Sequence, residues 1–510
     1  MNQQSAKLAA IANGEAISLN EIPFLELLDF QQTISSGVNR GQRVSALFGA
    51  ATAEPELTFL YVVLADDEEN HLHVGRTEVK GASFPSLTPH CPQVHLFERE
   101  IAEQFGLKAI GHPWFKPVRY CHSWTGRDAW ERPAEAAIQP AVGDFYRVAG
   151  EQVHEVAVGP VHAGVIEPGH FRFQCHGEEV MHLEIALGFQ HRGVEKALSG
   201  GPDARSLHLI ETLAGDTTIG HTIAYAQIIE ALSHTQKPVR AQALRGIALE
   251  LERLANHVGD LGALAGDVGF LPTASFCGRI RGEFLNLTAY LCGNRFGRGL
   301  VQPGGVGFDL DQRGIEEMLR RIEILRKESS DAINLLWENQ SVMARFEDTG
   351  RLAETLAVEL GIVGPAGRAS GLMRDVRYDH PSGIFRFAQM PISTYDSGDV
   401  FGRAYVRWME IQQSIAFIVE QLKNLPAGKV RLLPGALQSE TLAVALSEGW
   451  RGEICQVALT DAGGRFARYK IVDPSFHNWF ALAQVLRNQE ISDFPLCNKS
   501  FNLSYCGHDL

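Results

Sequence analysis

The stretch that decides the fold is RAQALRGIALELERLANHVGDLGAL, residues 240–264 of a chain of 510 residues. Ile247, Leu251, Leu254 and Val258 recur in it at spacings of four, three and four, and such spacings line one face of an α-helix. Three more stretches have the same character: 216–232, 315–337 and 400–422. The sequence therefore predicts a mainly helical region over much of the chain.

The chain before this region has the pattern of strands. Residues 43–48 alternate, residues 57–65 form a continuous apolar run, and the acidic turn DDEEN leads into residues 71–77, which is typical of a hairpin. A helix is expected over residues 94–105 and ends at Gly106, because glycine suits the left-handed conformation that follows many helices. A small α/β domain is predicted over residues 1–126.

Residues 127–150 carry charges, alanines, prolines and glycine without periodicity, which predicts a linker. The larger domain then covers residues 151–510, with smaller β elements at its entry. A chain of this length normally forms more than one domain. The predicted fold class is α+β, a small α/β domain followed by a mainly helical one.

The composition narrows the class of function. A net charge of −14 argues against a nucleic-acid partner, which would require a basic face. No run approaches the roughly 18–20 apolar residues of a membrane span, and the N-terminus has no secretory signal, so a cytoplasmic protein is expected. The eight cysteines include no Cys-x-x-Cys pair, which predicts free thiols.

A first family resemblance lies in the N-terminal part. The segment FEREIAEQFG, residues 97–106, is followed by Gly111-His-Pro113 and by Arg119. It resembles the signature of the 30 kDa subunit of complex I, which binds neighbouring subunits and performs no chemistry. The resemblance implies the same structural role here.

The second domain carries a longer set of motifs. They include GPVHAGVIEPGHFR (159–172), HRGVEK (191–196), ELERLANH (250–257) and PSFHN (474–478), with Arg368, Arg403, Arg407 and Arg451 between or after them. These resemble the 49 kDa subunit of complex I and, more closely, the large subunit of formate-hydrogenlyase and hydrogenase-4 type membrane-bound hydrogenases. The resemblance covers residues 40–510. It implies three kinds of partner: an iron–sulfur small subunit, a ferredoxin-like subunit and membrane ion-translocating subunits, which would hold the chain peripheral to the inner membrane.

The residues that define hydrogenase chemistry are changed. A nickel–iron centre needs four thiolates from two Cys-x-x-Cys pairs, because soft sulfur ligands hold and bridge the metals. In this chain the family's four ligand positions fall on Ala214, Thr217, Ser504 and Gly507. Cys506 stands one place away, without a partner. The resemblance therefore implies a family member without a metal site of its own.

The quinone positions of complex I are changed as well. A histidine and a tyrosine there donate hydrogen bonds or protons to the quinone, and their positions fall on Ile166 and Gly215, which can do neither. Asp267 aligns with the aspartate that couples to that histidine. Arg192 matches an arginine beside the partner's terminal iron–sulfur cluster, where a permanent positive charge favours the reduced state.

Two further groups are candidates for proton transfer. Glu167 matches the glutamate that relays protons in hydrogenases, and it could exchange protons with His162, Asp216 or His221. The alternative is that Glu167 caps or pairs structurally, and that Asp267 belongs to a structural ion pair. Both interpretations stay open for each residue.

No cofactor is expected on this chain itself. The glycine-rich turn at residues 303–307 lacks the strand–turn–helix context of a nucleotide site, so NAD binding, if the parent complex uses NADH, belongs elsewhere in that complex. The iron–sulfur cluster belongs to a partner, and a quinone is the molecule considered for the altered pocket. That pocket is expected between residues 159–172, residues 212–221 and the C-terminal tail.

Three functions remain. The first is a subunit of an oxidoreductase that packs on an iron–sulfur subunit and lines an altered acceptor pocket. The second is a non-catalytic scaffold that couples the iron–sulfur subunit to the membrane subunits. The third, a hydrogenase with other metal ligands, needs sulfur that the sequence does not supply. The first is preferred, because Arg192, Asp267 and Glu167 are retained.

Overall fold

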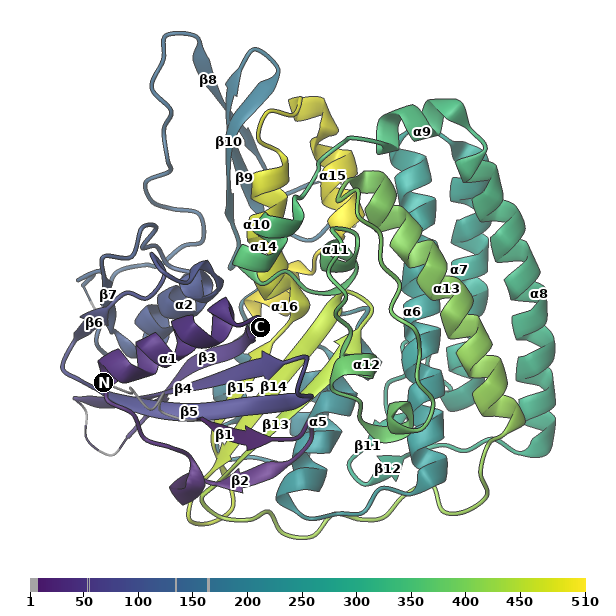
Figure 1. The fold of residues 1–510 in the computed structure, drawn as a ribbon, viewed down its shortest axis with the longest axis horizontal. Helices are drawn as coiled ribbons and strands as arrows, with labels where there is room; N and C mark the ends of the chain where they lie inside the picture. The colour runs from purple at the N-terminus through teal and green to yellow at the C-terminus, as the bar shows by residue number, and fades with distance from the viewer. Residues whose placement is uncertain (1–7, 53, 55, 134, 163–165) are drawn as a thin grey trace.

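The computed structural model describes residues 8–52, 54, 56–133, 135–162 and 166–510. Figure 1 shows sheets and short helices on one side and a group of long helices on the other. The α+β class is confirmed, with sheets in the N-terminal region and a mainly helical region after it. Across the described residues, no helix combines the length and the apolar character that crossing a membrane requires.

The N-terminal sheet has four antiparallel strands in the order β1-β5-β4-β3. The predicted strands are confirmed, because β3, β4 and β5 contain the three stretches named above. Most residues of β4 are buried, as expected of its continuous apolar run. The bounds are β1 (Ala9–Ile11), β3 (Arg43–Ala51), β4 (Leu57–Asp66) and β5 (His71–Lys80).

Two helices, α1 (Leu27–Asn39) and α2 (His95–Phe105), pack on this sheet. The predicted helix is confirmed as α2, and Gly106 follows it with φ of 66°. Phe105 packs so closely on β3 that a Cβ at Gly49 would lie 2.6 Å from its ring. A short parallel pair, β6 (Ser83–Pro85) and β7 (Lys108–Ile110), lies beside α2.

A three-stranded antiparallel sheet opens the second region and projects from the body in Figure 1. Its strands are β8 (Val153–Val158), β9 (His170–His176) and β10 (Glu179–Ala186). This agrees with the β elements expected at the entry of the larger domain. Apart from residue 134, which lies outside the described residues, residues 111–152 contain no helix or strand. The linker and the domain limits stay predictions.

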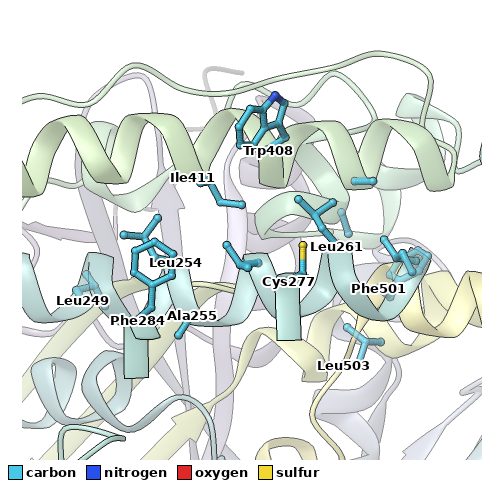
Figure 2. Packing of buried hydrophobic residues seen from close by; sticks show 14 of the residues in the cluster. Leu249, Leu254, Ala255, Leu261, Cys277, Phe284, Trp408, Ile411, Phe501 and Leu503 are labelled. Carbon is cyan, nitrogen blue, oxygen red and sulfur yellow. The ribbon is translucent and has the colours of Figure 1, made fainter. Parts of the chain in front are cut away.

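Long helices form the core of the second region. The four predicted helical stretches are confirmed as α5 (Thr218–Leu232), α6 (Val239–Asp267), α8 (Gln312–Trp337) and α13 (Val400–Lys423). A further long helix that the pattern did not predict, α7 (Leu271–Cys292), packs along α6. Figure 2 shows Leu254, Leu261, Cys277 and Ile411 meeting in the apolar interior between these helices.

A second four-stranded sheet near the C-terminus was not predicted. It contains β13 (Thr441–Gly449), β14 (Gly452–Thr460), β15 (Phe466–Val472) and β2 (Ala16–Ser18), all antiparallel. β2 comes from the N-terminal end of the chain and pairs with β13. The apolar core of the N-terminal sheet also includes Leu442, Val457 and Phe476. The two regions therefore share a core and a sheet.

Shorter elements complete the chain. The helices are α3 (Val194–Leu198), α4 (Ser206–Glu211), α9 (Gln340–Phe346), α10 (Glu354–Leu360), α11 (Gly364–Arg368), α12 (Val376–Asp379), α14 (Pro474–Val485), α15 (Phe494–Phe501) and α16 (Tyr505–Asp509), and a small ribbon joins β11 (Val301–Gln302) to β12 (Gly305–Val306). Four short 3-10 helices span Leu19–Glu21, Pro92–Val94, Gly383–Arg386 and Ile491–Asp493.

Candidate functional site

A cavity of about 780 Å³ lies where the loop before β9, the loop before α5 and the C-terminal helices α15 and α16 meet. These are the three segments between which a pocket was expected. The apolar part of the wall consists of Val158, Ile166, Phe171, Phe173, Phe296, Ile491, Phe494, Pro495, Leu503 and Tyr505. Its charged groups are Glu167, Asp216, Asp267, Arg281, Arg451 and Lys499.

Glu167 holds the start of the last helix. Its two carboxylate oxygens accept hydrogen bonds from the backbone N–H groups of Tyr505 and Cys506, each at 3.2 Å. A carboxylate at a helix N-terminus satisfies donors that the helix itself leaves free. Glu167 therefore caps a helix, which is the structural role considered as the alternative to proton transfer. Since the side chain is only partly buried and also lines the cavity, the proton-relay role stays a prediction.

Asp216 and Arg451 form a two-pronged ion pair at the cavity wall. The distances are 2.6 Å from Nη1 to Oδ1 and 2.8 Å from Nη2 to Oδ2. Burial raises the pKa of Asp216, but the Arg451 guanidinium outweighs it and the net shift is downward. His221, considered as a partner of Glu167, instead pairs with Asp473 at 3.0 Å and does not line the cavity.

Asp267 is the last residue of α6 and lines the cavity. Among the described residues it forms no ion pair within 4.0 Å, which leaves its structural alternative without support. The Asp267 side chain is exposed at the cavity, where partial loss of solvent raises its pKa and the Lys499 ammonium opposes the shift only in part. A carboxylate at a helix C-terminus also faces the negative end of the helix dipole. Asp267 is thus set to hold a proton more firmly than an ordinary aspartate.

The remaining predicted positions divide into two groups. His162, Ile166 and Gly215 line the cavity, and the His162 Nε2 lies 3.0 Å from the carbonyl oxygen of Gly169. A Cβ at Gly215 would meet nothing within 4 Å, so this position leaves open space. Arg192 does not line the cavity. It is exposed, and its guanidinium donates to the carbonyl oxygens of Thr212 and Leu213.

The four metal positions of the family offer few donor atoms. Ala214 has none, and Thr217 is buried between Asp216, Trp450 and Arg451. The Ser504 hydroxyl accepts from the backbone of Gly507 at 2.9 Å. All eight cysteines are free in the structure.

Cys506 is the cysteine among the cavity-lining residues. Burial, assisted by the Glu167 carboxylate, raises the pKa of its thiol to about 11. Beside the four family positions, Cys506 therefore supplies one thiol.

Gly507 leaves no room for a side chain. A Cβ there would lie 2.7 Å from Cγ and Oδ2 of Asp473, whose carboxylate is fixed by His221 and by the backbone N–H of Ser475. Gly507→Ala is expected to lower the free energy of unfolding by about 1–3 kcal/mol, the usual effect of overpacking. Thermal unfolding of the full chain measures it. Gly435→Ala, in open space, is the control, and equal midpoints for the two variants would contradict the packing argument.

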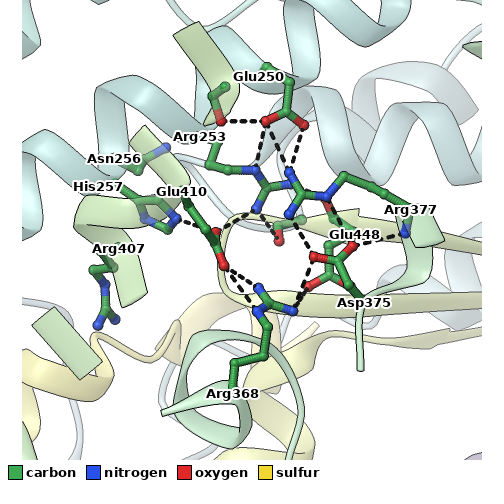
Figure 3. A network of polar contacts seen from close by, with 12 residues as sticks. Glu250, Arg253, Asn256, His257, Arg368, Asp375, Arg377, Arg407, Glu410 and Glu448 are labelled. Carbon is green, nitrogen blue, oxygen red and sulfur yellow. Dashed lines mark hydrogen bonds and ion pairs between the residues drawn. The ribbon is translucent and has the colours of Figure 1, made fainter. Parts of the chain in front are cut away.

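Glu250, Arg253 and His257 of the ELERLANH motif lie in a buried polar network, shown in Figure 3, and not in the cavity. Arg253 donates to Glu250 at 3.0 Å, and the His257 ring lies 2.8 Å from Glu410. Arg368, another motif residue, contacts Glu410 at 2.7 Å. This part of the sequence signature therefore stabilises the junction of helices and sheet.

Some cavity residues were not found by sequence reasoning. Arg281 and Lys499 belong to α7 and α15, and neither stands in a quoted motif. Tyr505 and Phe494 belong to the C-terminal segment, where only the metal positions had been considered. The alternation of apolar and polar residues in the β9 sequence HFRFQCH would have indicated Phe171 and Phe173 as core residues, but not as cavity walls.

Two family models match this chain. The model of the respiratory-chain NADH dehydrogenase 30 Kd subunit matches residues 25–133, and that of the 49 Kd subunit matches residues 267–439. The carbon monoxide-induced hydrogenase of Rhodospirillum rubrum is 31% identical over 350 residues, which cover 68% of this chain and 97% of that protein.

Two other relatives represent the two groups that the chain resembles, the hydrogenase-type subunits and the complex I subunits. Formate hydrogenlyase subunit 5 of Escherichia coli is 28% identical over 83% of this chain and 76% of its own length. NADH-quinone oxidoreductase subunit 4 of Thermus thermophilus is 27% identical over 67% of this chain and 90% of its own length.

These matches define a class, the large subunits of complex I-like and hydrogenase-like assemblies. The chain belongs to the complex I 49 kDa and hydrogenase large-subunit family, with a complex I 30 kDa domain fused before it. The relatives are subunits of multi-subunit assemblies.

Proposed function

We propose that this chain is the large peripheral-arm subunit of a membrane-associated oxidoreductase complex, and that its cavity takes up a quinone-type electron acceptor. The cavity carries the proposal. Its volume of about 780 Å³ falls within the range of roughly 300–1,000 Å³ that is usual for small-molecule sites, and apolar walls with a few polar groups suit an apolar ring with carbonyl oxygens. A scaffold would have no need for such a space.

The proposed partners are those of the relatives' assemblies: an iron–sulfur small subunit that supplies electrons, a ferredoxin-like subunit and membrane ion-translocating subunits. Through them the chain would lie on the cytoplasmic side of the inner membrane. Arg192 supports contact with an iron–sulfur cluster, because its exposed guanidinium is held in place by three backbone carbonyl groups, those of Thr212, Leu213 and Cys506. A fixed positive charge beside a cluster favours the reduced state.

The chain would work without nickel and iron of its own. Ala214 and Gly507 have no donor atoms, and Thr217 and Ser504 use their hydroxyl groups within the protein. The proposed chemistry therefore consists of binding the acceptor, excluding water and handling protons. Asp267, with its raised pKa, and Glu167 are the groups proposed to hold or pass protons at the cavity wall.

The second candidate is the non-catalytic scaffold. It is favoured by the loss of proton-donating side chains at Ile166 and Gly215 and by the engagement of Glu167 with the start of α16. In that case the cavity would bind no acceptor, and a side chain that fills it would leave the rate of cluster reoxidation unchanged.

Gly215→Leu separates the two candidates. The new side chain would extend from open space into the cavity, so reoxidation of the dithionite-reduced cluster by decylubiquinone is expected to slow at least tenfold in the complex purified with its iron–sulfur subunit. Gly435→Leu, also in open space and away from the cavity, is the matched control. If quinone reoxidises the cluster of the wild-type complex and the Gly215→Leu complex at the same rate, the acceptor binds at another site.

Metal analysis of the same preparation tests the absence of a nickel–iron centre. The preparation is expected to contain no nickel, and only as much iron as the clusters of the partner subunit account for. Stoichiometric nickel would contradict the proposal, and a wild-type complex whose cluster no quinone reoxidises would favour the scaffold.

A further inference from the structure

Glu252 of α6 carries a buried carboxyl group that stands apart from the ion pairs of the interior. The residue is 8% exposed, and among the described residues it forms no ion pair within 4.0 Å. Its two carboxyl oxygens instead accept the backbone N–H groups of Ile219 and Gly220, at 2.7 and 3.1 Å, in the first turn of α5. Backbone donors therefore satisfy this side chain.

The surroundings of Glu252 support both states of its carboxyl group. Burial favours the neutral acid, whereas the free N–H groups and the positive end of the α5 dipole favour the carboxylate. Burial is the larger influence and raises the pKa of Glu252 to about 8; the Asp216 carboxylate adds to this shift, and the Arg253 guanidinium opposes it. The group therefore keeps a proton near neutral pH, and its carboxylate has donors ready when the proton leaves.

Glu252 lines a small cavity that adjoins the large one. Its volume is about 10 Å³, close to the least that holds one water molecule. The walls of both cavities include Asp216, Arg281 and Phe296. Asn256 and Arg295 also line the small cavity, and the Asn256 amide donates to the carbonyl oxygens of Asp216 and Glu252, at 3.0 and 2.9 Å. A polar path one water long thus leads from Glu252 toward the candidate acceptor site.

We propose that Glu252 holds one of the protons that the reduced acceptor takes up, and that it passes this proton to the large cavity through the small one. The inference rests on the proposed function and names a proton-holding group behind that same site. A quinone takes two electrons, one at a time, from the partner's iron–sulfur cluster, and two protons, to become a quinol. For one of these protons, the O–H bond of Glu252 breaks and an O–H bond forms on the acceptor. The carboxylate stays with the N–H groups of α5 and regains a proton from solvent before the next turnover.

Glu252→Gln tests this in the complex purified with its iron–sulfur subunit. The amide keeps the size of the side chain but cannot act as an acid. At saturating decylubiquinone and pH 7, reoxidation of the reduced cluster is expected to slow at least tenfold, since a positioned acid contributes roughly 10²–10⁴-fold when it acts directly. The KM for decylubiquinone is expected to stay unchanged, because Glu252 does not line the large cavity.

The pH profile separates proton supply from a structural role. In the wild-type complex the rate is expected to fall as the pH rises through about 8, where the acid form of Glu252 is lost, and this step is expected to be absent in Glu252→Gln. Ferricyanide takes up electrons without protons, so its rate is expected to be the same in both complexes. Glu316→Gln, on the exposed face of α8, is the control and is expected to keep the wild-type rate and profile.

Three results would overturn the role of Glu252 while the proposed function stands, provided that Gly215→Leu still slows the reaction. The first is a wild-type rate and pH profile in Glu252→Gln. The second is a raised KM with an unchanged maximal rate, which would mean that Glu252 only shapes the pocket. The third is an equal loss of the ferricyanide rate, which would mean that the variant impairs electron supply. A wild-type complex that no quinone reoxidises would overturn both proposals.

Discussion

Replacing Arg368 with methionine is expected to lower the free energy of unfolding by about 3–5 kcal/mol, the usual effect of removing one partner from a buried ion pair. The Arg368 side chain is 1% exposed, and its guanidinium lies 2.7 Å from Glu410 and 2.8 Å from Glu448. Methionine fills similar volume but leaves these carboxylates buried and less well compensated. The effect should therefore come from charge and not from a cavity.

The charges of the network explain why it tolerates this loss so poorly. Three arginines face four carboxyl groups, namely Arg253, Arg368 and Arg377 with Glu250, Asp375, Glu410 and Glu448 (Figure 3). Burial, together with the nearby Asp375 carboxylate, raises the pKa of Glu448 to about 7, so near neutral pH this group is partly protonated. The network is close to balance only with all three arginines present.

Urea or thermal unfolding of the full chain measures the change. Arg326→Met is the matched control, because Arg326 pairs with Glu323 on the exposed face of α8, and pairs in solvent contribute little. The control is expected to unfold at the wild-type midpoint. If both variants shifted equally, burial of the network would not be the cause of its importance.

The long helices could be predicted where apolar residues recur at helical spacing. In α6 the residues at that spacing, Ile247, Leu251, Leu254 and Val258, are all buried, and most of the helix is buried with them. α8 shows the pattern most simply, because its buried residues lie opposite an exposed face. α7 escaped prediction because Gly278 and Gly282 interrupt it, and glycine weakens any helical pattern.

The C-terminal sheet escaped prediction for a different reason. All residues of β13 and β14 are buried, so neither strand shows the alternation of a half-exposed strand. Its fourth strand, β2, comes from more than 400 residues earlier in the chain, since Ser18 pairs with Thr441. A contact between segments so far apart leaves no local signal in the sequence.

The candidate site was predictable in place but not in detail. Motif resemblance brought Glu167, Gly215, Asp267 and Ser504 to one region, and the structure groups them around one cavity. That Glu167 also caps α16, or that Glu252 lines a smaller cavity beside this one, depends on tertiary packing alone. A motif names positions, whereas hydrogen-bond partners depend on the neighbours that the fold supplies.

A carboxyl group next to the cavity is expected to make stability depend on pH. Glu252 of α6 is 8% exposed, and its carboxyl oxygens accept the N–H groups of Ile219 and Gly220 at 2.7 and 3.1 Å. Burial raises its pKa from 4.5 to about 8, and the Asp216 carboxylate adds to the shift while the two N–H groups oppose it. Glu252→Gln, which resembles the protonated acid at every pH, should remove this dependence.

The sign follows from proton binding. Between pH 4.5 and 8 the folded protein keeps a proton on Glu252 that the unfolded chain releases, so wild-type stability is highest below this window and falls as the pH rises through it. Relative to wild type, Glu252→Gln is therefore expected to gain on the order of 3–5 kcal/mol between pH 5 and pH 9. Using the difference between two proteins cancels other titrating groups, including Glu448. Glu316→Gln, on the exposed face of α8, is the control, and its stability is expected to change with pH in parallel with that of wild type. If the stability of Glu252→Gln also ran parallel to wild type, Glu252 would be ionised in the folded protein at neutral pH.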